Sequence, residues 1–190
     1  MGKTKMNAIA WVAVSVVLIL ISCIGASLIQ TDFGGVTVTD VRLPMPDGET
    51  LRVLVHRPAT ATEDNPAPAV ITSHGYHATL ETQDITSIEL ARRGFVVFNM
   101  DTYSAGSSSG TTLPYGVSRS YYGLGMLQLV DYVHDNIDYV DPDRIGITGH
   151  STGGRNVAFT LDAYGRNEHG LEYTGQPSDA SDYKTKVSSA

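Results

Sequence analysis

The chain of 190 residues is poor in cysteine and in positive charge. Its single cysteine, Cys23, excludes an internal disulfide and any zinc or iron–sulfur site built from several cysteines. Only 13 basic residues stand against 20 acidic ones, a net charge of -7, and no basic cluster interrupts the acidic body. This charge argues against nucleic acid as a partner. Long-period repeats are also missing, and the 42% hydrophobic composition with 8 prolines is that of a globular protein, not of a coiled coil or a disordered chain.

Charge is completely missing between Ala8 and Ile29, which predicts a membrane anchor over residues 8–29. At about 1.5 Å per helical residue the run spans about 33 Å, enough for the hydrocarbon core of a bilayer. Lys3 and Lys5 precede it, so the positive-inside rule predicts that residues 1–7 are cytoplasmic and that the rest of the chain lies outside the cytoplasm.

Two alternatives to an uncleaved anchor stay open for the N-terminal segment. Residues 20–23 resemble a bacterial lipoprotein cleavage box, which would leave Cys23 lipidated. A cleaved signal peptide is the other alternative, although no small-residue cleavage site of the usual form is present. The apolar character continues beyond Cys23 to Ile29, which favours the uncleaved anchor.

A short linker is expected at residues 30–35, followed by two strands. Alternating apolar residues predict strands over residues 36–43 and 51–55, joined as a hairpin by the turn sequence at residues 46–48. The parity of the alternation changes in the first strand, which suggests a β-bulge near Asp40.

The pattern then changes to buried strands that alternate with helices. Short apolar runs suit strands buried on both faces of a parallel sheet, and helical spacing of apolar residues appears between and after them. The predicted strands contain residues 69–72, 95–98 and 144–147, and the predicted helices span about residues 82–93, 120–136 and 152–164. This order indicates an α/β fold: a mostly parallel sheet with an N-terminal hairpin and helices on both faces.

The motif that carries chemistry is Gly149-His150-Ser151-Thr152-Gly153, which matches G-x-S-x-G. It stands directly between a predicted strand and a predicted helix, as a nucleophile elbow requires. Small residues on both flanks let the serine project from a tight turn, and the helix N-terminus stabilises developing negative charge. Ser151 is the candidate nucleophile; the plainer alternative is a glycine-rich turn in which Ser151 caps the helix.

A second piece, His74-Gly75-Tyr76, ends the strand that contains residues 69–72. Acyl transfer needs two backbone N–H donors directed at the oxyanion. We expect one from Thr152, the residue after the nucleophile, and the other from Tyr76.

Together these segments resemble the α/β-hydrolase superfamily, and most closely its dienelactone hydrolase and prolyl-oligopeptidase-like branch. The resemblance rests on residues 68–76 (PAVITSHGY), 91–109 (ARRGFVVFNMDTYSAGSSS) and 141–154 (DPDRIGITGHSTGG). It implies that Ser151 attacks a carbonyl, that a histidine acts as general base, and that no cofactor is needed.

The family order of serine, then acid, then histidine is not matched by a usable acid and base after Ser151. Asp162 lies far along the helix that leaves the turn, and His169 follows that helix. The remaining candidates receive plainer interpretations. We expect His74 and Asp101 to brace loops, His56 to be solvated, His134 to lie at or near the surface and His150 to pack beneath the turn. His77 is a weak candidate for a residue that faces the site. Residues 103–116 are expected to form a mobile wall or a flexible linker.

The sequence therefore predicts a partial α/β-hydrolase domain over residues 36–190, carried by one transmembrane helix. The leading hypothesis is a membrane-anchored serine hydrolase for ester or small amide bonds in a small-molecule or peptide substrate, without metal or cofactor. Because the acid and the base are missing, we expect this chain to be an N-terminal portion that is inactive by itself. The alternative is a non-catalytic anchored domain that acts as a binding or interaction module.

Overall fold

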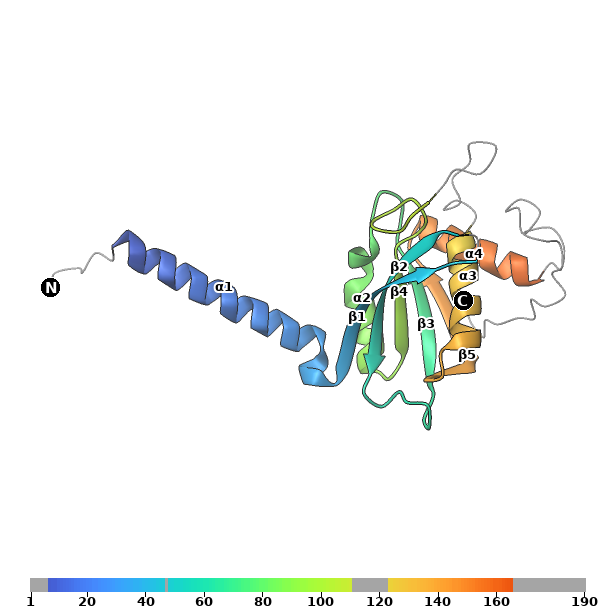
Figure 1. Ribbon diagram of the computed structural model, residues 1–190, viewed down its shortest axis with the longest axis horizontal. Coiled ribbons are helices and arrows are strands. Elements are labelled where there is room, and N and C mark those ends of the chain that lie inside the picture. The colour runs from blue at the N-terminus through green and yellow to red at the C-terminus, as the bar shows by residue number, and fades with distance from the viewer. Residues whose placement is uncertain (1–6, 47, 111–122, 166–190) are drawn as a thin grey trace.

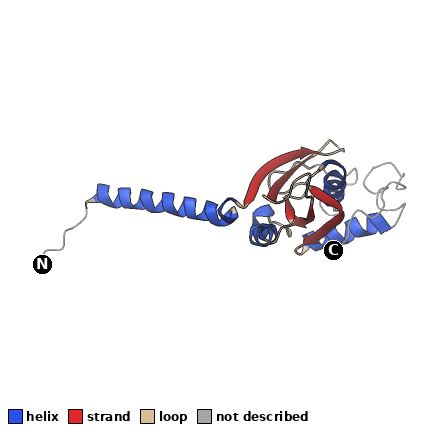
Figure 2. Cartoon of the chain, turned by 90° about the horizontal axis from the view of Figure 1, so that it is seen from below, coloured by secondary structure: helices blue, strands red, loops and turns tan. Residues whose placement is uncertain are grey.

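The computed structural model describes residues 7–46, 48–110 and 123–165. In it, one long helix leads into a five-stranded sheet with helices on both faces (Figures 1 and 2). The elements in chain order are α1 (Ala8–Gln30), η1 (Asp32–Gly34), β1 (Val36–Pro44), β2 (Thr50–Pro58), β3 (Ala67–Ser73), η2 (Leu80–Gln83), α2 (Asp84–Arg92), β4 (Val96–Met100), α3 (Leu124–Asn136), β5 (Val140–Gly149) and α4 (Thr152–Gly165).

Helix α1 carries the uncharged run and buries no residue against the rest of the protein. Asn7 caps its N-terminus, since the side chain of Asn7 accepts a hydrogen bond from the backbone N–H of Ala10. Among the described helices α1 is the one long and apolar enough to cross a membrane, a property that an N-terminal signal sequence shares. The three-residue turn η1 occupies half of the expected linker of residues 30–35.

The strand order is β1-β2-β4-β3-β5. Strands β1 and β2 form the predicted antiparallel hairpin, β2 pairs antiparallel with β4, and β3 pairs parallel with both β4 and β5. The carboxyl ends of the three parallel strands therefore meet at one edge of the sheet, where ligands bind in open α/β sheets. The loops after these strands build the candidate site.

Two apolar clusters lie on opposite faces of the sheet. On one face, Ala91 of α2 packs with Val36 and Val97. On the other, residues of α3 and α4 such as Leu127 and Tyr164 pack against a larger cluster that includes the side chains of β2, β3, β4 and β5. Helices thus cover both faces, as expected, and the larger core lies under α3 and α4.

The bulge expected near Asp40 is wrong. The register of β1 on β2 runs without interruption from Val36 opposite Pro58 to Pro44 opposite Thr50. The apolar alternation changes parity because the strand serves both faces: Val36 and Val38 join the cluster under α2, whereas Val41 and Leu43 pack on the larger core.

His56 is buried, with 2% of its surface exposed, so the expectation of a solvated side chain is also wrong. It lies on β2 opposite Val38 of β1 and Val97 of β4, on the face that α2 covers. Burial lowers the pKa of His56 from its usual 6.5, because the cationic ring would lose its hydration there.

We expect this buried histidine to make folding less favourable in acid. The unfolded chain takes up the proton near pH 6.5, before the folded protein does, so the free energy of unfolding falls as the pH drops below that value. The variant His56→Val should lose this component, at most about 1.4 kcal/mol per pH unit. Urea unfolding of both detergent-solubilised proteins at pH 8 and pH 5.5 tests this; a stability difference that is equal at both pH values would contradict it.

Candidate active site

Ser151 occupies a sharp turn between the end of β5 and the first residue of α4. Its backbone φ is 55°, in the left-handed region that non-glycine residues rarely adopt. Such strain persists where the surrounding structure enforces it, and it is concentrated at functional sites. The side chain is exposed and lines a pocket, so the hydroxyl can meet a bound molecule.

The two glycines of the motif are required by close backbone contacts. A Cβ at Gly149 would lie 2.3 Å from the carbonyl carbon of Gly153, and a Cβ at Gly153 would lie 2.1 Å from the carbonyl oxygen of Ser73. Neither space admits a methyl group. The G-x-S-x-G spacing therefore follows from the packing of the start of α4 against the ends of β5 and β3.

Hydrogen bonds fix the turn to the end of β3. The backbone N–H of His150 donates to the carbonyl oxygen of Ser73 over 3.1 Å. One turn into α4, the buried Asn156 donates from Nδ2 to the hydroxyl of Ser73, also over 3.1 Å. Sequence reasoning missed Asn156, because a polar residue within a helical apolar pattern gives no signal of a partner on a distant strand.

The His74–Tyr76 segment lies directly against the turn. A Cβ at Gly75 would be 3.4 Å from the Cβ of Ser151 and 3.0 Å from Nδ1 of His150. Gly75, Tyr76 and Ser151 line the same pocket. The structure therefore brings together the strand-end segment and the candidate nucleophile that the sequence placed far apart.

His74 braces this segment, as expected, and both of its ring nitrogens are in use. Nε2 accepts a hydrogen bond from the backbone N–H of Thr102 over 3.1 Å, which requires the proton on Nδ1, and Nδ1 lies 2.7 Å from the carbonyl oxygen of Gly75. The ring is 2% exposed. His74 therefore has no nitrogen left with which to serve Ser151.

Asp101 also braces loops, in agreement with the sequence interpretation. Its carboxylate is fully buried and accepts hydrogen bonds from the backbone N–H groups of Leu80, over 2.8 Å, and Ser107, over 2.9 Å. The Arg52 guanidinium lies 3.4 Å from the same carboxylate. The side chain thus connects the segments that follow β3 and β4.

Arg52 forms ion pairs with two further carboxylates close to Asp101. It contacts Asp40 at 2.9 Å and Glu81 at 2.7 Å. The Thr79 hydroxyl and then the Arg52 guanidinium lower the pKa of Glu81 to about 2, so Glu81 is ionised at any physiological pH. These charges hold η2 against the hairpin. Sequence reasoning gave no role to Arg52, since its partners lie on three different elements.

The segment after Asp101 forms a wall beside the site through residue 110. Ser109 bridges to the hairpin: its hydroxyl donates to Glu49 over 2.6 Å and accepts from the backbone N–H of Thr50 over 2.7 Å. The Ser108 hydroxyl accepts from the backbone N–H of Arg52. A flexible linker is therefore the wrong description of residues 103–110; residues 111–116 of the expected wall lie outside the described residues.

Two pockets flank the His74–Tyr76 segment. One, of about 520 Å³, contains Ser151 and His150 and is also lined by Thr82 and Gln83 of η2 and Thr86 of α2. The other, of about 460 Å³, contains Thr152 and extends along the Tyr103–Gly106 wall. The lining of the Ser151 pocket is polar without charged carboxylates or amines, which suits a neutral substrate.

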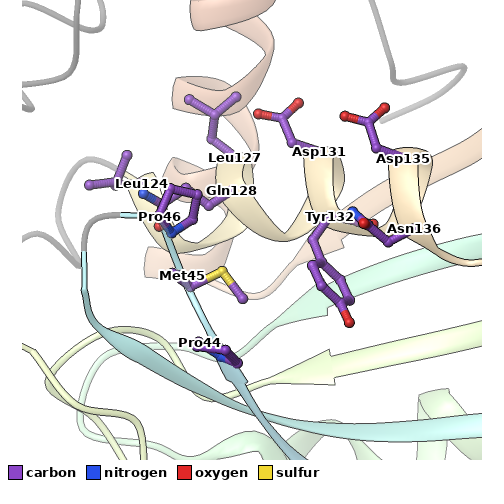
Figure 3. A pocket seen from close by; sticks show the side chains of 10 residues that line it. All are labelled: Pro44, Met45, Pro46, Leu124, Leu127, Gln128, Asp131, Tyr132, Asp135 and Asn136. Atoms are coloured by element: carbon purple, nitrogen blue, oxygen red, sulfur yellow. The ribbon is translucent and has the colours of Figure 1, made fainter.

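A third pocket, of about 390 Å³, lies apart from the candidate site, between the end of β1 and helix α3 (Figure 3). Pro44, Met45 and Pro46 face Leu127 and Tyr132 across it. It shares no lining residue with the Ser151 pocket, so we assign it no part in the chemistry.

None of the other histidines that the structure describes contacts the Ser151 hydroxyl. His150 is exposed beside Gly75 instead of packed beneath the turn, because α4 and β3 approach too closely to leave room there. His77 is exposed and lines the pocket that contains Thr152. His134 lies near the surface of α3 next to Asp135. Asp162 is exposed on α4, and Glu168 and His169 lie outside the described residues.

The described residues contain no group of three potential metal ligands. The turn thus presents an exposed serine hydroxyl at the N-terminus of helix α4, beside a pocket and between braced loops, as a nucleophilic serine requires.

Solved structures with the same fold are hydrolases. A bacterial heroin esterase is 26% identical, with a TM-score of 0.55 over 77% of this chain. An acetyl xylan esterase from Paenibacillus sp. R4 is 18% identical, with a TM-score of 0.55 over 66% of this chain. The α/β hydrolase GrgF from Penicillium sp. sh18 is 19% identical, with a TM-score of 0.53 over 67% of this chain. The matches cover 45%, 45% and 42% of those chains, so this chain spans under half of their length.

The neighbours confirm the α/β-hydrolase fold, while the dienelactone hydrolase branch stays a prediction. The sequence model of the X-Pro dipeptidyl-peptidase (S15) family matches residues 47–163, which include β2 to β5, the His74–Tyr76 segment, Ser151 and most of α4. This match covers more than half of the chain. The chain therefore belongs to the X-Pro dipeptidyl-peptidase (S15) family.

Proposed function

We propose that the protein is a membrane-anchored serine hydrolase that cleaves ester or small amide bonds outside the cytoplasm. In this proposal Ser151 is the nucleophile, and the backbone N–H groups of Tyr76 and Thr152 form the oxyanion hole. Membership of a peptidase family and likeness to esterases support hydrolysis as the reaction class.

The observation that carries the proposal is the strained turn at Ser151. A serine with φ of 55°, exposed beside a pocket and enclosed by two glycines that tolerate no side chain, serves no evident purpose in packing. The strain is explained if the hydroxyl must be presented to a substrate.

The oxyanion donors follow from the position of α4. Thr152 is the first residue of the helix, and the first N–H groups of a helix have no intrahelical acceptor. The positive end of the helix dipole adds to their effect on a developing oxyanion. Tyr76 supplies the opposing donor because Gly75 brings its segment against Ser151.

In the proposed reaction the Ser151 oxygen attacks the substrate carbonyl while a histidine takes the hydroxyl proton. No histidine among the described residues hydrogen-bonds to Ser151. This observation favours a second candidate for the chain as given, an anchored domain that binds without turnover. The net negative charge of the chain is compatible with both a hydrolase and a binding domain.

A fluorophosphonate probe separates the two candidates. We expect slow covalent labelling of the 190-residue chain that disappears in Ser151→Ala, because a single phosphonylation during a long incubation needs only the serine and the backbone donors, whereas turnover also needs a base. The matched control is Ser104→Ala, since Ser104 also has a positive φ, of 64°, and lines the neighbouring pocket; it should keep the labelling. Labelling of Ser151→Ala equal to that of the parent would refute the nucleophile, and no labelling of either would support the binding module.

Turnover is tested separately with a short-chain nitrophenyl ester. We expect little hydrolysis by this chain, because none of the described residues gives Ser151 a base, and a serine without one retains only the contribution of the oxyanion hole. Robust hydrolysis that Ser151→Ala abolishes would show that a base exists within these residues.

Anchoring is tested by intact-mass analysis of membrane-extracted protein. Retention of the N-terminus at Met1 or Gly2 supports an uncleaved anchor, and a mature N-terminus at a lipidated Cys23 would refute it.

A further inference from the structure

Outside α1, four described large apolar side chains are exposed: Phe33 (75%), Tyr76 (62%), Ile85 (81%) and Leu161 (38%). Single exposed apolar residues are normal on soluble proteins. Three of these four, however, lie on one side of the domain. Phe33 is in η1, Ile85 is in the first turn of α2, and Tyr76 precedes η2 in the loop that leads to α2.

This side is the one at which α1 meets the domain. Arg92, in the last turn of α2, donates from Nη2 to the backbone carbonyl of Ile29 over 2.5 Å, and its Nε lies 3.5 Å from Asp32. Figure 1 shows α1 approaching the side of the domain that α2 covers, and Figure 2 shows α2 next to the end of α1 with the sheet beyond it. The outer face of α2 is therefore turned toward the end of the membrane helix.

The turn between α1 and β1 exposes an aromatic ring next to the last turn of α2. Asp32 and Phe33 have φ values of 48° and 54°, and this backbone leaves the Phe33 side chain in the open immediately after the apolar helix. Aromatic side chains at this position favour the interface between headgroups and acyl chains. Trp11, 60% exposed, lies near the other end of α1.

We propose that the membrane-facing side formed by Phe33 and the outer face of α2, which includes Ile85 in its first turn, rests on the bilayer that α1 spans. The inference rests on the proposed anchoring by α1. The Ser151 pocket is lined by Thr82, Gln83 and Thr86 of the same helical segment, so it opens beside the lipid surface. The substrate is then an amphiphilic ester or amide that partitions into that surface.

Depth-dependent quenching tests the contact. Trp11 is the single tryptophan, so Trp11→Phe provides a silent background for Phe33→Trp, Ile85→Trp and Leu161→Trp, the last on α4 at the opposite face of the sheet. The full chain is reconstituted into phosphatidylcholine vesicles brominated at shallow acyl positions. We expect loss of fluorescence for Phe33→Trp and Ile85→Trp, and little loss for Leu161→Trp.

The parent protein separates failure of this inference from failure of anchoring. If Trp11 itself is not quenched, α1 is not inserted and the anchoring proposal fails. If Trp11 is quenched but Ile85→Trp loses no more fluorescence than Leu161→Trp, α1 is inserted and the membrane-facing side is refuted.

Substrate delivery is tested with two fluorophosphonates, one with a long alkyl chain that partitions into vesicles and one short and water-soluble. Ile85→Gln should slow labelling of Ser151 by the long-chain probe and leave the short-chain rate unchanged, because Ile85 lies outside both pockets. Equal effects on both probes would overturn delivery from the lipid surface. Absence of labelling with either probe in the parent would instead refute the nucleophile.

Discussion

Gly153→Ala is expected to destabilise the protein by about 3 kcal/mol, a large fraction of the about 5–15 kcal/mol that stabilises a typical domain. The new methyl group would lie 2.1 Å from the carbonyl oxygen of Ser73, 2.8 Å from the Ser73 carbonyl carbon and 2.9 Å from the carbonyl oxygen of His74. All three atoms belong to the backbone, so no side chain can rotate away. Helix α4 would have to move off β3 and break the His150 to Ser73 hydrogen bond.

The adjacent residue provides the matched control. A Cβ at Gly154 meets only the carbonyl oxygen of Gly149, at an ordinary 3.5 Å. Because alanine favours helix over glycine, Gly154→Ala should be neutral or stabilising by up to about 1 kcal/mol. Urea unfolding of the two variants in detergent measures the contrast. Equal stabilities would show that the G-x-S-x-G spacing has no steric origin here.

Asp101→Ala is also expected to lower the free energy of unfolding strongly, by about 3 kcal/mol. The substitution removes the acceptor for the buried backbone N–H of Leu80 and for the half-buried backbone N–H of Ser107. A buried donor left unpaired costs about 1–3 kcal/mol. It also removes the fully buried partner of Arg52. The loops on both sides of the His74–Tyr76 segment should loosen, so labelling of Ser151 should slow as well.

Asp40→Ala is its control, because Asp40 contacts the same guanidinium but has 48% of its side chain exposed. A solvent-exposed ion pair contributes at most about 1 kcal/mol, so this variant should unfold almost as the parent does. Thermal or urea unfolding gives both values. If Asp40→Ala were as destabilising as Asp101→Ala, the role of Asp101 as a buried brace would be refuted.

The order of elements could be predicted because it depends on local patterns. Alternation in the hairpin, short apolar runs in β3 and β4, and helical spacing in α3 and α4 each reflect what a single element buries. The turn at Ser151 was recognisable for the same reason: its glycines and its place between strand and helix are all within a few residues. The resemblance to hydrolases then supplied the superfamily.

The sequence-based predictions that proved wrong, and the residues that were missed, concern contacts between elements far apart in the sequence. The parity change in β1 was interpreted as a bulge, since the sequence does not show that α2 and α3 lie on opposite faces of that strand. His56 was placed in solvent because its burial depends on β1, β4 and α2 together. The Arg52 and Asp101 brace and the polar lining from Thr82 to Thr86 likewise arise from chain segments that meet only after folding.

The two-sided packing of β1 also determines how the domain opens. Its first half contributes Val36 to the apolar cluster under α2, and its second half lays Val41 and Leu43 on the cluster under α3 and α4. Detaching this strand from β2 would expose both layers in one event. The two faces of the sheet should therefore behave as one cooperative unit, whose backbone amides exchange with solvent together. Because β1 follows α1 after only a short turn, tension applied through α1 would act first on the strand that packs against both layers.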